Sequence, residues 1–182
     1  MMEDLALNIM DVVQNSLAAG ASRIEVEIEE DPVKDLLVIE VRDNGEGMSS
    51  EEVEQCQDPF YTTKREIKVG LGIPLFKEAA EHCDGSFVIE SEKGVGTRLR
   101  AVFRLSHIDR PPLGDLEGTI LSLMVTNPHV DFLFRYKGSG VFELDTREVK
   151  EMVEDLHLTH PEVLKFLREY MTEGMKEVRR AI

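Results

Sequence analysis

Apolar residues recur along the first half of the chain with two different spacings, which predict a mixture of helices and strands. Residues 4–19 carry apolar side chains three and four positions apart, as an amphipathic helix does, and Gly20 marks its end. Residues 23–29 alternate apolar and charged side chains, as a half-buried strand does, and residues 36–41 form a second strand. The other elements predicted here are helices at 49–56 and 74–82, strands at 86–90 and 97–105, and a long loop at 57–72.

A proline-rich stretch, Arg110-Pro111-Pro112-Leu113-Gly114, predicts a boundary between two units. We assign residues 1–108 to the first unit and residues 109–182 to a smaller α+β unit. In the second unit we predict strands near 118–126, 130–136 and 141–144, followed by two helices whose first turns are capped at Asp145 and Thr159.

The charge of the chain is strongly acidic and limits its partners. The chain carries 21 Lys and Arg against 36 Asp and Glu, a formal net charge of −15. Such a surface repels polyanions, so we expect no nucleic-acid partner, and a nucleotide site would need its own local positive potential. Arg98, Arg100 and Arg104 share one face of the strand at 97–105, and we expect glutamates of the strand at 23–29 to pair with them if the two strands are neighbours.

Signals for a membrane or for secretion are missing from the sequence. No stretch approaches the roughly 18 consecutive apolar residues that a membrane span needs, and the N-terminus lacks the basic start of a secretory signal. Cys56 and Cys83 fit neither a disulfide framework nor a metal-ligand spacing. We therefore expect a cytoplasmic protein that does not contact a membrane.

Four polar or glycine-rich segments follow one another in a suggestive order, although no Walker-type phosphate loop is present. The segments are Asp11 to Asn15, Asp43 to Gly47, Asp58-Pro59-Phe60 through Lys64 to Gly70-Leu71-Gly72, and Gly94 to Thr97. Together they resemble the N, G1, F, G2 and G3 boxes of the GHKL superfamily, which includes histidine kinases, gyrase-type topoisomerases, MutL-type repair proteins and a chaperone family. Residues 59–104 most resemble sensor histidine kinases, whereas residues 15–24 look more like the MutL group.

The resemblance implies a nucleotide site that binds ATP with Mg²⁺. Asn15 would complete the magnesium shell, and Asp11, one helical turn earlier, is a possible general base. Asp43 would accept a hydrogen bond from the adenine amino group, with Thr97 beside it. Gly45 and Gly47 would let the backbone approach the base closely. From the residues alone, Asn15 also fits a solvated polar stripe, and Asn44-Gly45 also fits a hairpin turn.

The resemblance also implies an ATP lid in the loop at 57–72. Phe60 would pack the base of the lid, and Lys64 would contact phosphate and take a catalytic part. Gly70, Leu71 and Gly72 would bind the nucleotide with backbone N–H groups at the start of the next helix. Basic residues in this acidic chain supply the required positive potential, and an exposed flexible loop with incidental lysines is the alternative. The basic residues of the loop are Lys64, Arg65 and Lys68.

Three departures from the family pattern bear on the reaction. Asp11 stands where orthodox histidine kinases carry asparagine and ATP-hydrolysing relatives carry glutamate. Lys68 replaces the leading glycine of the lid motif. We expect no phosphoacceptor helix ahead of Leu5, and His160 is the only passable acceptor histidine in the sequence.

The fold that the resemblance implies is α+β: a two-layer α/β sandwich of the Bergerat type, with a mixed sheet and helices on one face, plus a small C-terminal α+β appendage. Three functions stay open: a protein kinase acting in trans on histidine or serine, an ATPase whose lid closure drives dimer contacts, and a regulator that binds nucleotide without turnover. In each, residues 109–182 would contact a protein partner or a second copy in a homodimer.

Overall fold

The computed structural model describes residues 4–61, 71–154 and 156–179. Its helices are α1 (Leu5–Ala18), α2 (Ser50–Cys56), α3 (Gly72–His82), α4 (Leu116–Thr126), α5 (Thr146–Val153) and α6 (Pro161–Arg179). Its strands are β1 (Arg23–Asp31), β2 (Leu36–Asp43), β3 (Ser86–Glu92), β4 (Gly96–Arg104), β5 (Asp131–Lys137) and β6 (Val141–Asp145).

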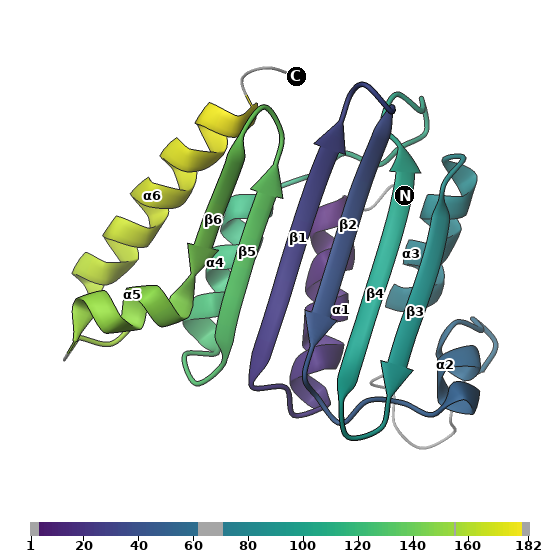
Figure 1. Ribbon diagram of the computed structural model, residues 1–182, viewed down its shortest axis with the longest axis horizontal. Helices are drawn as coiled ribbons and strands as arrows, with labels where there is room; N and C mark the ends of the chain where they lie inside the picture. Colours follow the sequence, from purple (N-terminus) through teal and green to yellow (C-terminus); the bar gives the residue numbers. More distant parts are fainter. Residues whose placement is uncertain (1–3, 62–70, 155, 180–182) are drawn as a thin grey trace.

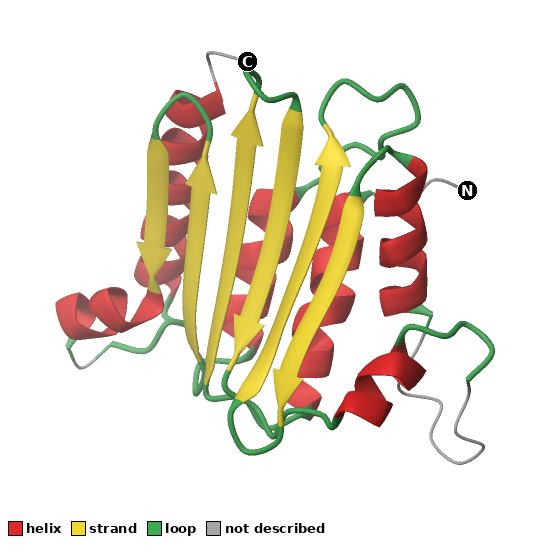
Figure 2. Ribbon diagram, turned by 45° about the vertical axis from the view of Figure 1, so that its right-hand side comes forward, coloured by secondary structure: helices red, strands yellow, loops and turns green. Residues whose placement is uncertain are grey.

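The strands form a single six-stranded mixed sheet in the order β3-β4-β2-β1-β5-β6. Strand β1 pairs parallel with β5, and the other neighbours pair antiparallel. Helices α1, α3, α4 and α6 lie against one face of the sheet (Figures 1 and 2). This arrangement confirms the predicted α+β fold of a mixed sheet with helices on one face.

The apolar face of each strand turns toward the helices, as the alternation in sequence requires. In β1, Ile24, Val26 and Ile28 are at most 2% exposed, whereas the glutamates between them reach the other face. Helix α1 begins at a cap where the Asp4 carboxylate accepts the N–H of Leu7 at 3.0 Å. Its buried Leu5 and Ile9 pack on the same core.

The residues after 109 extend this sheet and share its core. Strands β5 and β6 add to the edge formed by β1, and one cluster of buried residues includes Ile24 of β1, Phe134 of β5 and Leu167 of α6. The sequence did not predict this pairing, because a parallel partner of β1 that follows it by about a hundred residues leaves no local signal.

The strand predicted at 118–126 is wrong, because these residues belong to helix α4. The Asp115 carboxylate accepts the N–H of Gly118 at 3.0 Å and caps the helix. Leu116, Ile120 and Leu123 are buried at helical spacing. A short apolar run rich in branched residues is compatible with a helix or a strand. Packing between the sheet and its neighbours decides which of the two forms. The strands predicted at 130–136 and 141–144 are confirmed as β5 and β6.

The two C-terminal helices are confirmed, with one change at a cap. The Asp145 carboxylate accepts the N–H of Arg147 at 2.9 Å at the start of α5, as predicted. At the start of α6 it is the His160 Nδ1 that accepts the N–H of Glu162, at 3.3 Å. The imidazole of His160 therefore has a structural contact at a helix start.

The open face of the sheet is a charged surface whose arginines are paired, but not with the predicted strand. Arg98 of β4 binds Glu40 and Glu90 at 2.9 Å each, because β4 lies between β2 and β3. The glutamate Glu27 of β1 instead pairs with Arg135 of β5 at 2.9 Å. None of the helices in the described ranges is long and apolar enough to cross a membrane.

Candidate functional site

The end of strand β2 meets helix α1 through a short hydrogen bond. The hydroxyl of Ser16, which is 3% exposed, donates to Oδ2 of Asp43 at 2.6 Å. The N–H of Gly45 donates to Oδ1 of the same carboxylate at 2.9 Å. Each carboxylate oxygen therefore has one fixed donor and can still accept a second hydrogen bond from a ligand.

Helix α1 carries Asp11 and Asn15 one turn apart, and both are half-buried. Asn15, the candidate magnesium ligand, directly precedes Ser16 on α1. Ser16 in turn contacts Asp43, the candidate adenine-binding residue at the end of β2. The predicted roles of Asn15 and Asp43 in one site stay predictions.

Helix α3 begins against Asp11. A Cβ atom on Gly72 would lie 2.9 Å from the Cβ of Asp11 and 3.0 Å from its Oδ2, so glycine allows this approach. Leu71 precedes the helix without a side-chain cap, and the side chain of Leu71 is 56% exposed. The first turn of α3 therefore faces the carboxylate of Asp11.

The loop after Asp43 is held by its glycines and by Asn44. A Cβ on Gly47, whose φ is +70°, would lie 1.9 Å from the carbonyl oxygen of Glu92. A Cβ on Gly45 would lie 2.9 Å from Ala19. The side-chain oxygen of Asn44 accepts the N–H groups of Ser22 and Arg23 at 2.9 Å each. The alternative of a hairpin at Asn44-Gly45 is therefore excluded, and α2 follows the loop instead of a strand.

Three polar residues form a row across the inner face of the sheet at this end. Asp43 of β2 lies opposite Thr97 of β4, and Thr97 lies opposite Ser91 of β3. The Oγ atoms of Ser91 and Thr97 are 2.8 Å apart. The next row toward the middle of the sheet is apolar, so the polar row marks where the core ends and the site begins.

The lid region is described only at its two ends. Lys64, Gly70, Arg65 and Lys68 lie outside the described residues, and their predicted roles stay predictions. Phe60 is described and is 92% exposed, and its predicted packing at the base of the lid, whose residues 62–70 lie outside the described ranges, stays a prediction. Its N–H donates to the Asp58 carboxylate at 2.8 Å in the turn after α2. Beside Gly47, Lys93 supplies a described positive charge and pairs with Glu52 at 3.3 Å.

Two serines of the site, Ser16 and Ser91, were not predicted from the sequence. Ser16 follows the motif residue Asn15, and Ser91 falls on the inward positions of β3 because Phe87 and Ile89 do. Helical and strand periodicity could therefore have placed both side chains inward. Their partners depend on strand register, which the sequence does not supply.

No group of three or more His, Cys, Asp or Glu suited to a metal is found among the described residues. A magnesium ion that is bound mainly by phosphates and waters needs only one or two protein oxygens. The side-chain amide of Asn15 on α1 fits that requirement, and it is the residue that would hold the ion.

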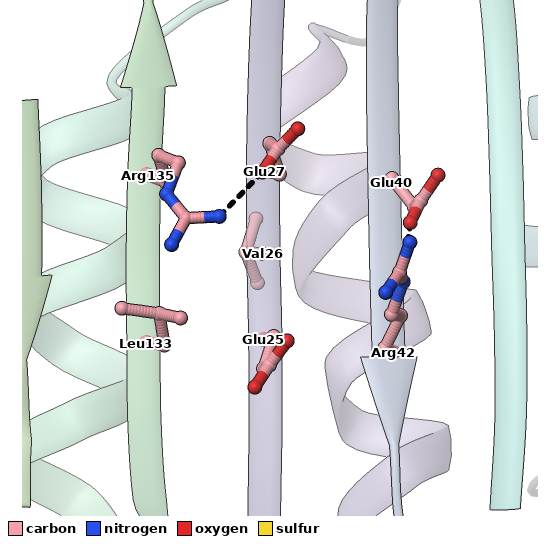
Figure 3. A pocket seen from close by; sticks show the side chains of 7 residues that line it. All are labelled: Glu25, Val26, Glu27, Glu40, Arg42, Leu133 and Arg135. Atoms are coloured by element: carbon pink, nitrogen blue, oxygen red, sulfur yellow. Dashed lines mark hydrogen bonds and ion pairs between the residues drawn. The ribbon is translucent and has the colours of Figure 1, made fainter. Parts of the chain in front are cut away.

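A separate hollow on the open face of the sheet does not belong to this site. It is lined by charged residues of β1, β2 and β5, together with Val26 and Leu133 (Figure 3). Its carboxylates already bind guanidinium groups, with Arg42 on Glu40 and Arg135 on Glu27. The helices lie behind the sheet in this view, so the hollow is on the face away from Asp43, whose partner Ser16 is on α1.

A protein-family model described as "Histidine kinase-, DNA gyrase B-, and HSP90-like ATPase" (HATPase_c) matches residues 2–107, more than half of the chain. The chain belongs to this family. The match contains every described residue of the site, from Asp11 to Thr97, and confirms the resemblance to the GHKL superfamily.

Individual relatives in this family are bacterial sensor kinases. Sporulation kinase C of Bacillus subtilis (strain 168) is 34% identical over 96 residues, which are 53% of this chain and 22% of that protein. Sensor histidine kinase YxdK of the same organism is 33% identical over 106 residues, 54% of this chain and 32% of that protein. The chain thus spans less than a third of the length of these curated relatives.

The fold likeness extends beyond the HATPase_c match. A solved structure titled "Crystal Structure of N terminal domain of a DNA repair protein" superposes with a TM-score of 0.53 and 17% sequence identity, and covers 78% of this chain and 51% of that chain. The 78% of this chain that is covered is more than residues 1–107 make up, so residues of the C-terminal region take part in the shared fold.

Proposed function

We propose that the chain binds ATP together with Mg²⁺ between α1, the loop after β2 and the start of α3. The observation that carries the proposal is the Asp43 carboxylate, which Ser16 and Gly45 hold at 2.6 and 2.9 Å at the edge of the core. A fixed carboxylate with spare acceptor capacity suits the exocyclic amino group of adenine. Asn15 takes the magnesium ion in this proposal.

We further propose that the chain transfers the γ-phosphoryl group to a protein acceptor in trans. Its sensor-kinase relatives support this reading, and so does the carboxylate of Asp11 beside the first turn of α3. Asp11 acts as a general base that takes the proton of the acceptor. The same carboxylate also suits activation of a water molecule, and this favours ATP hydrolysis as the second candidate function.

Phosphoryl transfer from γ-labelled ATP separates the two candidate functions. Label on an added protein fraction means a kinase, and free labelled phosphate means an ATPase. Binding of ATP without either product would contradict both and leave a nucleotide-dependent regulator.

The substitution Asp11→Asn tests the role of the base. It keeps the size of the side chain but removes the proton acceptor, so we expect turnover to fall by about 100-fold or more while ATP affinity stays within a few-fold. The exposed Asp109→Asn serves as the matched control and keeps full turnover. Unchanged turnover in Asp11→Asn would contradict the assignment.

Residues 109–182 contact a protein partner or a second copy in this proposal. Phe166 and Tyr170 of α6 stack with ring centroids 5.8 Å apart and are 43% and 44% exposed. Light scattering with and without nucleotide measures the mass. A monomer under both conditions would contradict the homodimer and leave a different protein as the partner.

A further inference from the structure

Ser91 is a side chain of the site to which the family motifs give no part. It lies on β3, the edge strand of the sheet, and its hydroxyl oxygen meets three other groups. The N–H of Met48 donates to Ser91 Oγ at 2.7 Å, the carbonyl oxygen of Gly96 lies 3.0 Å away, and Thr97 Oγ1 lies 2.8 Å away. Ser91 therefore joins the loop after Asp43 to the start of β4.

The other contacts of Ser91 favour Thr97 as the donor of the Ser91–Thr97 hydrogen bond, for which the geometry allows either direction. A serine hydroxyl has one proton to donate and two lone pairs. Ser91 donates its proton to the carbonyl oxygen of Gly96 and accepts from Met48 N–H. Its remaining lone pair then accepts the proton of Thr97. The oxygen of Thr97 is left as an acceptor.

The row of residues places this acceptor next to a second one. Thr97 lies opposite Asp43 in the β2–β4 register, and both are inward-facing residues at the end of their strands. Asp43, as a carboxylate, offers only acceptors. Two neighbouring acceptors suit the amino group of a 6-amino purine, which has two N–H donors, and disfavour the carbonyl oxygen that a 6-oxo purine carries at the same position.

We propose that Ser91 is a positioning residue that makes the site select a 6-amino purine over a 6-oxo purine, by holding the Thr97 hydroxyl proton away from the ligand. The inference rests on the proposed ATP site. The inference adds the origin of the base selectivity of that site. It assigns this selectivity to Ser91, which acts through Thr97 and Met48.

Removal of the Ser91 hydroxyl should change the nucleotide selectivity, which would not change if Ser91 had a purely structural role. In Ser91→Ala the proton of Thr97 loses its acceptor, so the hydroxyl can rotate and donate to a 6-oxo group. Affinity for the 6-oxo nucleotide then rises relative to the 6-amino nucleotide. A general loosening of the site would weaken both nucleotides together.

The experiment measures dissociation constants by calorimetry for non-hydrolysable analogues of ATP and of inosine triphosphate, each with Mg²⁺. We expect Ser91→Ala to lower the ratio of the inosine constant to the adenosine constant by about 3- to 10-fold, which corresponds to one neutral hydrogen bond. Ser86→Ala on the same strand is the matched control, because Ser86 is exposed and lies on the open face. It should leave the ratio unchanged.

Two further variants protect the test against a folding defect. Ser91→Cys fills the same space with a weaker acceptor and should also lower the ratio, whereas Ser91→Thr keeps the hydroxyl and should restore it. A ratio that stays at the wild-type value in both Ser91→Ala and Ser91→Cys, while the wild type binds the ATP analogue, would overturn the role of Ser91 alone. A wild type that binds neither analogue would instead overturn the proposed ATP site.

Discussion

At the scale of single residues, the Asp43 carboxylate is held by the Ser16 hydroxyl and the Gly45 N–H. The family resemblance implied roles for Asp43, Thr97 and Asn15, and these roles stay predictions. The motifs did not predict Ser16 or Ser91, because a serine is unremarkable until the strand and the helix that bring its partner are known. The resemblance could therefore propose the residues that contact the ligand, whereas the serines that contact those residues became visible only in the structure.

Ser16→Ala tests that support directly. The substitution removes the donor 2.6 Å from Asp43 Oδ2 and leaves the carboxylate held by the Gly45 N–H alone. A hydrogen bond to a charged group contributes about 1.5–3 kcal/mol, so we expect affinity for an ATP analogue to fall by roughly 10-fold or more. Calorimetry measures the affinity, and Ser22→Ala, whose hydroxyl binds Asn44, is the comparison. Equal affinities in the Ser16 variant and the wild type would show that Asp43 needs no such support.

At the scale of elements, the predictions held where a periodic pattern was long or capped. Helices α1, α2 and α3 and strands β1 to β4 lie where the pattern predicted them. The error at α4 arose in an apolar run of nine residues, 118–126, in which helix and strand differ little. The capping aspartate Asp115, three residues before that run, was the signal that could have corrected it.

Packing of α6 on β6 leads to a prediction at Gly174. A Cβ there would lie 2.1 and 2.2 Å from ring carbons of Phe142, so Gly174→Ala forces the helix or the ring to move. Overpacking of this kind costs about 1–3 kcal/mol and exceeds the gain of about 1 kcal/mol in helix propensity. We expect a lower unfolding midpoint in urea. Thr172→Ala at an exposed position of α6 is the control and should keep or raise the midpoint; a Gly174 variant as stable as this control would contradict the packing.

At the scale of the whole molecule, ion pairs connect the C-terminal region to strand β1. Burial alone would raise the pKa of Asp145, but hydrogen bonds from Arg147 and Arg23 outweigh it and lower that pKa to about 2. Arg23 belongs to β1, so this buried carboxylate joins β1 to the start of α5. The sequence predicted the cap at Asp145 but not the arginine from a strand 122 positions away.

The lowered pKa of Asp145 predicts how stability depends on pH. A carboxylate whose pKa is lower in the folded state stabilises the fold above the unfolded value of about 4 and loses that contribution as the pH falls toward 2. Asp145→Asn should therefore lower the free energy of unfolding by about 1–2 kcal/mol at pH 7 and by progressively less below pH 4. Urea unfolding of both proteins between pH 2 and pH 7 measures the difference. A difference that is constant across this range would show that the charge of Asp145 plays no part.

The central claim is that Asn15 and Asp43 form one site for a magnesium–adenosine triphosphate complex. Calorimetry with a non-hydrolysable ATP analogue, with Mg²⁺ and with a chelator, tests it most directly in the wild type, in Asn15→Ala and in the exposed neighbour Gln14→Ala. We predict Mg²⁺-dependent binding in the wild type and in Gln14→Ala, and binding at least about 10-fold weaker in Asn15→Ala. A wild type that gives no heat of binding, or an Asn15 variant that binds as the wild type does with the same magnesium dependence, would contradict the account.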